Sequence, residues 1–176
     1  MDSKVVIPPP IFGKKDTLVF DALAPFKLPS YILDTTEALN YELIRKNLYI
    51  LITNIAGLEV YGNIESLNKD HNEIIQAVSN DVLDIQDWLT ETTNEHSRLI
   101  EGIMEAFNGD PQHCYMGPSA PVHLTRALGF ADQAGLPTSK LEEISSKYLQ
   151  RTQWGGCPPP AQFFLKKTNH EAVKTI

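Results

Sequence analysis

The stretch His71–Phe107 reads HNEIIQAVSNDVLDIQDWLTETTNEHSRLIEGIMEAF, and its apolar spacing decides the fold class. Steps of alternately four and three residues from His71 select a seam that is apolar at most positions. Residues at this spacing share one side of a helix, so the stretch predicts an amphipathic helix of about 55 Å. The seam consists of His71, Ile75, Val78, Val82, Ile85, Leu89, Thr92, His96, Leu99, Ile103 and Ala106.

The weakest point of this predicted helix is the run Thr90–Glu95, which consists mostly of poor helix formers. Thr92 and Glu95 have the spacing of a capping box, in which a threonine side chain caps the start of a new helix. We expect one continuous or kinked helix through this run. The alternative is two helices that meet near Thr92.

A second long helix is predicted before this stretch. Asp34-Thr35-Thr36-Glu37 has capping-box spacing, with Asp34 as the cap, and it precedes a run of apolar residues at helical spacing. Gly57 or Gly62 ends that run. A strand over Tyr49–Thr53 is the competing interpretation, because tyrosine and isoleucine suit a buried sheet. We favour the helix because the helical spacing is unbroken from the cap.

Two shorter helices are predicted nearer the C-terminus. The first follows Ser119, which can cap it, and closes at Gly135. The second opens at the capping box Ser139–Glu142 and extends to Trp154. Together with the two long helices they predict an all-α fold, a four-helix-type bundle over residues 35–154.

Residues 1–34 and 155–176 are predicted to be extended arms. The prolines of 8–10 and 158–160 restrict the backbone and remove amide donors. Within the first arm, Thr17–Phe20 suits a short strand. This arm is too apolar for a free tail, so we expect it to pack along its own helical domain or to embrace a partner subunit, the first being favoured.

Composition narrows the class of protein. The chain has 176 residues, the length of one domain, and its net charge of −7 disfavours binding to nucleic acid or to an anionic membrane. No basic-then-apolar leader and no apolar run of membrane-spanning length occurs, so we expect a cytoplasmic protein. Cys114 and Cys157 lie far apart and are interpreted as reduced thiols rather than as a disulfide framework.

Acidic side chains gather in the middle of the chain. From Glu59 to Asp110 the sequence has twelve acidic residues and only two basic ones, Lys69 and Arg98. Most of them recur opposite the seam, which predicts a solvated helix face. A surface for a basic partner is the functional alternative.

His96 is the sharpest candidate for chemistry, because it occupies a seam position beside Glu95. An imidazole in a bundle core can ligate a metal or haem, or act as a general base. The competing interpretation is a structural histidine hydrogen-bonded to a neighbouring helix. His113 and Cys114 are weaker candidates for a base and a nucleophile, and His123 lies near them in sequence. No paired cysteines and no Glu-x-x-His occur, so no metal site is predicted and the cofactor, if any, is not specified.

These observations support two functions. The first is a non-enzymatic interaction or assembly protein that uses its apolar arms and the seam for self-association or for docking into a complex. Its partner is then another protein or a second copy of this chain. The alternative is a small helical-bundle enzyme or cofactor-binding protein whose pocket, near Thr92 and His96, takes a small-molecule ligand.

Overall fold

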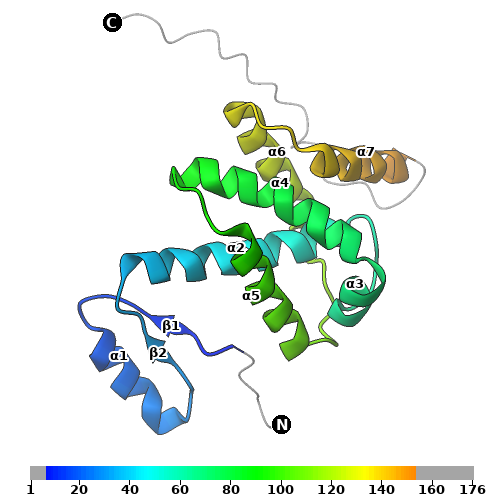
Figure 1. Ribbon diagram of the computed structural model, residues 1–176. Coiled ribbons are helices and arrows are strands. Elements are labelled where there is room, and N and C mark those ends of the chain that lie inside the picture. The colour runs from blue at the N-terminus through cyan, green and yellow to red at the C-terminus, as the bar shows by residue number, and fades with distance from the viewer. Residues whose placement is uncertain (1–6, 154–176) are drawn as a thin grey trace, which may run out of the picture.

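The computed structural model of the protein describes residues 7–153 and is mostly helical (Figure 1). Two parts are distinguished by their contacts. The N-terminal unit comprises β1 (Pro10–Ile11), α1 (Asp16–Leu23), the 3-10 helix η1 (Ala24–Phe26) and β2 (Tyr31–Ile32). The helical body comprises α2 (Thr36–Gly57), α3 (Ile64–Asp70), α4 (Asn72–Thr90), α5 (His96–Gly109), α6 (Ala120–Ala134) and α7 (Ser139–Gln153).

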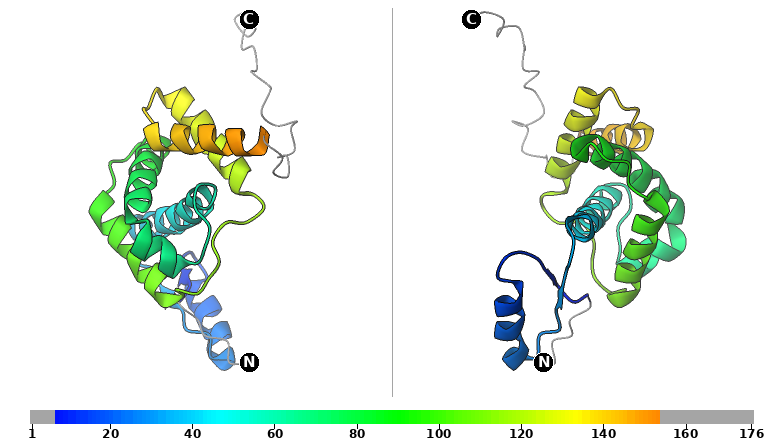
Figure 2. Two further views of the ribbon diagram at one scale, coloured as in Figure 1. Left: turned by 90° about the vertical axis from the view of Figure 1, so that its right-hand side faces the viewer. Right: turned by 60° about the vertical axis from the view of Figure 1, so that its left-hand side comes forward.

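The helical body is built around α2, which packs against α4, α5, α6 and α7. In the right-hand view of Figure 2, α2 is seen almost end-on, with α4 and α5 to its right and α6 and α7 above it. The helix interpretation of Tyr49–Thr53 is confirmed, and α2 ends at Gly57, one of the two ends that the sequence offered. The cap is Thr35 rather than Asp34, because the Thr35 hydroxyl accepts the Ala38 backbone N–H at 3.1 Å.

The His71–Phe107 stretch forms two helices, so the expectation of one continuous or kinked helix is wrong. Chain reversal begins at Glu91, whose left-handed backbone (φ 51°) ends α4. The Thr92 capping box does not form, and the residue before α5 is Glu95, which makes no side-chain cap. Away from the break the seam is buried as predicted, at Ile75, Val78, Val82, Ile85, Leu99, Ile103 and Ala106.

Gly102 of α5 lies against two side chains of α2. Gly102 lies where α5 crosses α2, and a Cβ atom there would meet the Tyr41 hydroxyl at 2.6 Å and Arg45 Cδ at 2.8 Å. Tyr41 in turn donates to the Arg98 carbonyl at 3.3 Å, and the Arg98 guanidinium lies over its ring. The break therefore lets α5 turn back and bury Leu99 and Ile103 against α2.

The N-terminal unit differs from the predicted extended arm. Thr17–Phe20 lies in α1 rather than in a strand. β1 and β2 pair in parallel, Pro10 with Tyr31 and Ile11 with Ile32, and α1 connects them. A parallel pair needs a crossover connection, and the helix supplies it. The predicted C-terminal arm, residues 155–176 with Cys157, and Trp154 lie outside the described residues.

Within residues 7–153 no helix combines the length and apolarity that crossing a membrane requires.

Candidate functional site

A groove runs between α2, α4 and α6. It consists of two adjoining cavities of about 290 Å³ each, which share Asn47 and Gln86 in their lining. Each is at the small end of the range known for ligand cavities, about 300–1,000 Å³. We call this feature the interhelical groove; it is lined by Asn40, Leu43, Ile44, Asn47, Leu51, Val82, Ile85, Gln86, Leu89, Thr90, His123, Arg126, Ala127 and Phe130.

The interhelical groove is lined by both apolar and polar side chains. Gln86 is only 7 % exposed, and no hydrogen bond engages its side-chain amide within residues 7–153. On the α6 wall the Arg126 guanidinium lies 5.5 Å from the centre of the Phe130 ring, a cation–π contact. Eight of the fourteen lining residues are apolar, so the groove is suited to an apolar side chain or to the apolar face of a helix.

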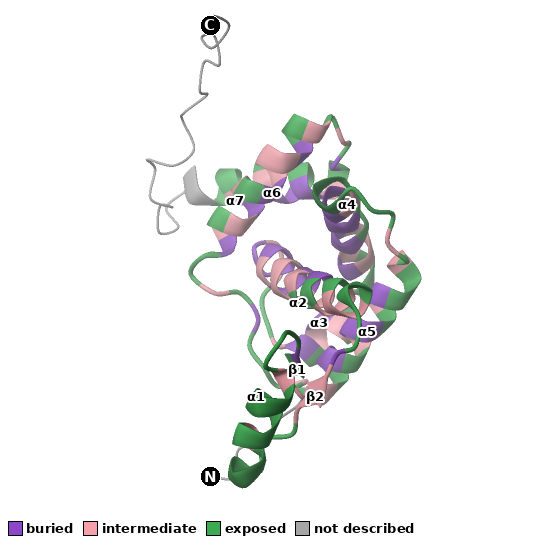
Figure 3. Cartoon of the chain, turned by 90° about the vertical axis from the view of Figure 1, so that its left-hand side faces the viewer, coloured by how far each residue is buried: buried purple, intermediate pink, exposed green. Residues whose placement is uncertain are grey.

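The N-terminal unit carries a second candidate surface. No residue of α1 is buried, and α1 packs against β1, β2 and η1. Figure 3 shows α1 coloured almost entirely as exposed. A helix in this position leaves large apolar side chains in water. We call them the α1 surface: Phe12, Leu18, Val19, Phe20, Phe26 and Leu28.

His96 lies at the junction of α4 and α5, where its Nε2 atom is 3.0 Å from Asp87 Oδ2. The other carboxylate oxygen of Asp87 accepts the backbone N–H and the side-chain amide of Asn94. The imidazole therefore takes part in closing the turn between the two helices. Neither cavity of the interhelical groove is lined by Thr92, Glu95 or His96.

The three residues of the Cys114 region are placed on different features. His113 Nδ1 lies 3.7 Å from Asp110, and Cys114 is exposed in a segment whose backbone bridges to Asn63. His123 instead lines the interhelical groove on α6. In the described part of the chain no group of three or more histidine, cysteine and acidic side chains could hold a metal ion.

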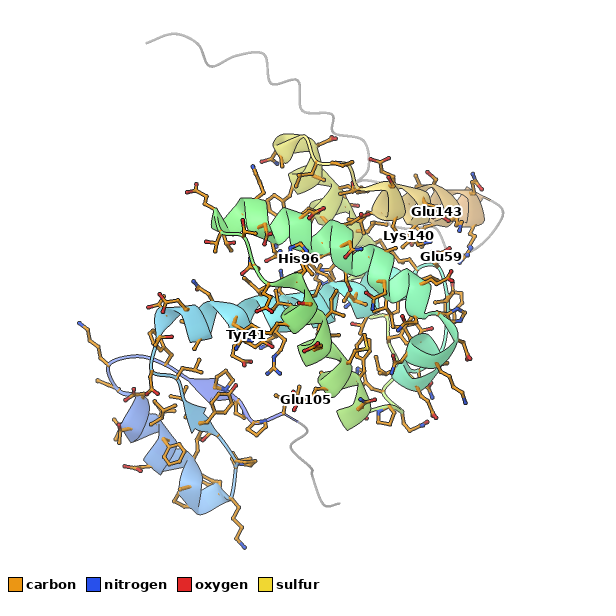
Figure 4. All side chains as sticks on the ribbon, viewed as in Figure 1. Tyr41, Glu59, His96, Glu105, Lys140 and Glu143 are labelled. Atoms are coloured by element: carbon orange, nitrogen blue, oxygen red, sulfur yellow. The ribbon has the colours of Figure 1, made fainter. Side chains whose placement is uncertain are left out.

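Glu59, the first residue of the acidic run, is a structural acceptor. Glu59 is paired by Lys140 at 2.8 Å and by Lys147, and Lys147 also contacts Glu143 (Figure 4). Burial alone would raise the pKa of Glu59, but the two ammonium groups outweigh it and hold the pKa below its usual value. This cluster ties α7 to the end of α2.

Asp81 is a cap supplied by another helix. Its Oδ2 atom accepts the backbone N–H groups of Lys140 (2.9 Å) and Leu141 (3.0 Å) in the first turn of α7. Burial raises the pKa of Asp81, and these two hydrogen bonds only partly oppose that effect. No local signal in the sequence connects Asp81 with a helix that begins 58 residues later.

The chain matches no protein-family model, no curated protein and no solved structure.

Proposed function

We propose that this protein is a non-enzymatic assembly protein that self-associates through the α1 surface. The helical body is the scaffold, and the N-terminal unit is the arm that makes the contact. The observation that supports the proposal is the exposure of Leu18 (65 %) and Phe26 (74 %) on a unit with its own strand pair, β1 and β2.

The α1 surface is unlike ordinary scattered apolar exposure. Its members lie close in sequence on α1 and its flanking turns, and clusters of exposed large apolar side chains mark interaction sites in soluble proteins. The apolar seam of the helical body does not compete for this role, because its residues on α4 and α5 are mostly buried in the core. We therefore assign self-association to the α1 surface of the N-terminal unit.

The test is the mass of the protein in solution as a function of concentration, measured by sedimentation equilibrium or light scattering. We expect the wild-type chain to associate and Phe26→Asp to weaken association by about 10- to 100-fold, because burying a phenylalanine contributes about 1.5–3 kcal/mol. Leu18→Asp should have a similar effect.

Tyr61 provides a matched control, since it is 72 % exposed and lies between α2 and α3, outside the N-terminal unit. Tyr61→Asp should associate as the wild type does. A wild-type protein that remains monomeric at every concentration would overturn the proposal, as would equal weakening by Tyr61→Asp and Phe26→Asp.

We assign no second function to the Asp87–His96 pair, because its geometry is accounted for by the turn between α4 and α5.

A further inference from the structure

The two cavities of the interhelical groove meet at Gln86 and Asn47. Gln86 is more than nine-tenths buried, lines both cavities and has no side-chain hydrogen bond among the described residues. Asn47 lies beside it in the lining of both. Around these amides the walls present Leu43, Leu51 and Leu89. The apolar face of a helix that lies in this groove would cover these leucines, as in helix-in-groove recognition.

The apolar side of α1 matches the interhelical groove in length. Leu18, Ala22 and Phe26 are spaced four residues apart, so they lie along one side of α1 and η1. From Leu18 to Phe26 the helix rises about 12 Å, while the α2 wall from Asn40 to Leu51 rises about 16 Å. The apolar side of α1 therefore fits within the length of the groove.

Charge fixes the direction in which α1 would lie. The cavity at the Leu51 end contains Arg126, which makes no ion pair within residues 7–153, and the cavity at the Asn40 end contains Thr90, the last residue of α4. The α4 C-terminus carries partial negative charge, and the exposed Glu91 follows it. On the arm, Asp21 precedes Lys27 by six residues, so one orientation places Asp21 at Arg126 and Lys27 at the end of α4.

We propose that α1 and η1 of one copy lie in the interhelical groove of a second copy, with Asp21 facing Arg126. This inference rests on the proposed self-association and names its second surface. In Figures 1 and 3, α1 lies across α2 from α4 and α6, which places the arm away from the groove of its own copy. Two different surfaces meet, so the contact is heterologous and builds reciprocal dimers, rings or chains.

Charge reversal tests this pairing, since Asp21 and Arg126 are both exposed and neither is needed for the core. We expect Asp21→Arg alone and Arg126→Glu alone each to weaken self-association by about tenfold or more, because like charges then face each other. An equimolar mixture of the two variants should recover wild-type association, because every arm–groove contact between unlike copies is then complementary. The recovered assembly should contain both variants in equal numbers.

Asp132→Arg is the control for the change in net charge, because Asp132 is exposed on α6 and does not line the groove. It should associate as the wild type does. Circular dichroism and the melting temperature of each variant show that the fold is retained.

Two negative results have different meanings. A monomeric wild type overturns both the self-association and the groove contact. A wild type that associates, together with Arg126→Glu that associates equally well and a mixture without preference, overturns the groove contact alone and leaves self-association through the α1 surface standing.

Discussion

Asp81 holds the start of α7 from a different helix, and its removal is the most direct test of how the body is assembled. The Asp81 carboxylate accepts two backbone N–H groups, those of Lys140 and Leu141. Asp81→Ala leaves both donors without that partner. Loss of a helix cap costs about 0.5–2 kcal/mol, and two donors lose their acceptor here, so we expect a loss of about 1–2 kcal/mol.

That loss corresponds to a decrease in melting temperature of about 2–8 °C for a chain of this length. Asp81→Asn is the matched variant, since its amide oxygen can accept the same bonds without a buried charge. Burial raises the pKa of Asp81, which means that the folded state disfavours the ionised carboxylate. The asparagine variant should therefore stay within about 0.5 kcal/mol of the wild type at pH 7.

The assay is urea denaturation followed by circular dichroism, repeated between pH 7 and pH 3. With a raised folded pKa the native state binds the proton more tightly, so the contribution of Asp81 to stability falls as pH rises through that pKa. As the solution is acidified, the free energy of unfolding of the wild type should rise relative to that of the asparagine variant. An asparagine variant as unstable as the alanine variant, or an alanine variant as stable as the wild type, would refute the reasoning.

Three further predictions concern the helical body. The pKa of Glu59 is lowered in the folded state. The contribution of Glu59 to stability is therefore present above about pH 4.5 and is lost as pH falls through the folded-state pKa. Glu59→Gln should remove this loss, so that the melting temperature depends less on pH in the acid range. Gly57→Ala should lower the free energy of unfolding by about 1–3 kcal/mol in denaturant titration, because the new Cβ would lie 2.4 Å from the Cβ of Met116. Gly129→Ala is the control: it has open space around it and should raise the free energy of unfolding by about 0.5–1 kcal/mol. Asp87→Ala should lower the free energy of unfolding by about 1–3 kcal/mol, because it removes all three hydrogen bonds that close the turn between α4 and α5. His96→Ala removes only one of them and should cost less. Equal losses in the two variants would contradict this account.

Local signals in the sequence were sufficient for α2, α6 and α7, but they missed α3 and the break between α4 and α5. The spacing of apolar residues predicted α2, and glycine predicted where helices stop, at Gly57 and at Gly135, whose φ is 66°. Ser139 was correctly placed at the start of α7. Each of these features depends on residues within one or two turns of each other, which is the range over which side chains and backbone decide between helix and turn.

The candidate site was only partly visible in the sequence. Leu43 widens the apolar stripe of α2 beyond what one packing face needs, which is a signal that a second surface exists. Nothing local indicates that Gln86 and Arg126 would meet α2 at the same groove, because three helices from distant parts of the chain form it. Likewise α1 forms although Val19 and Phe20 suit a strand, since it connects the paired strands β1 and β2.

By itself the sequence determined the helical class and the placement of most helix ends. Tertiary structure decided the break at Glu91 and the roles of Asp81, Asp87 and Glu59, which the sequence shows only as members of an acidic run. The physical reason is that a carboxylate acquires its role from the donor it meets, and the donors for Asp81 and Glu59 lie on α7, far away in the chain. The His71–Phe107 seam similarly specifies two buried faces, while the break between them and the packing of α5 against α2 belong to the tertiary structure.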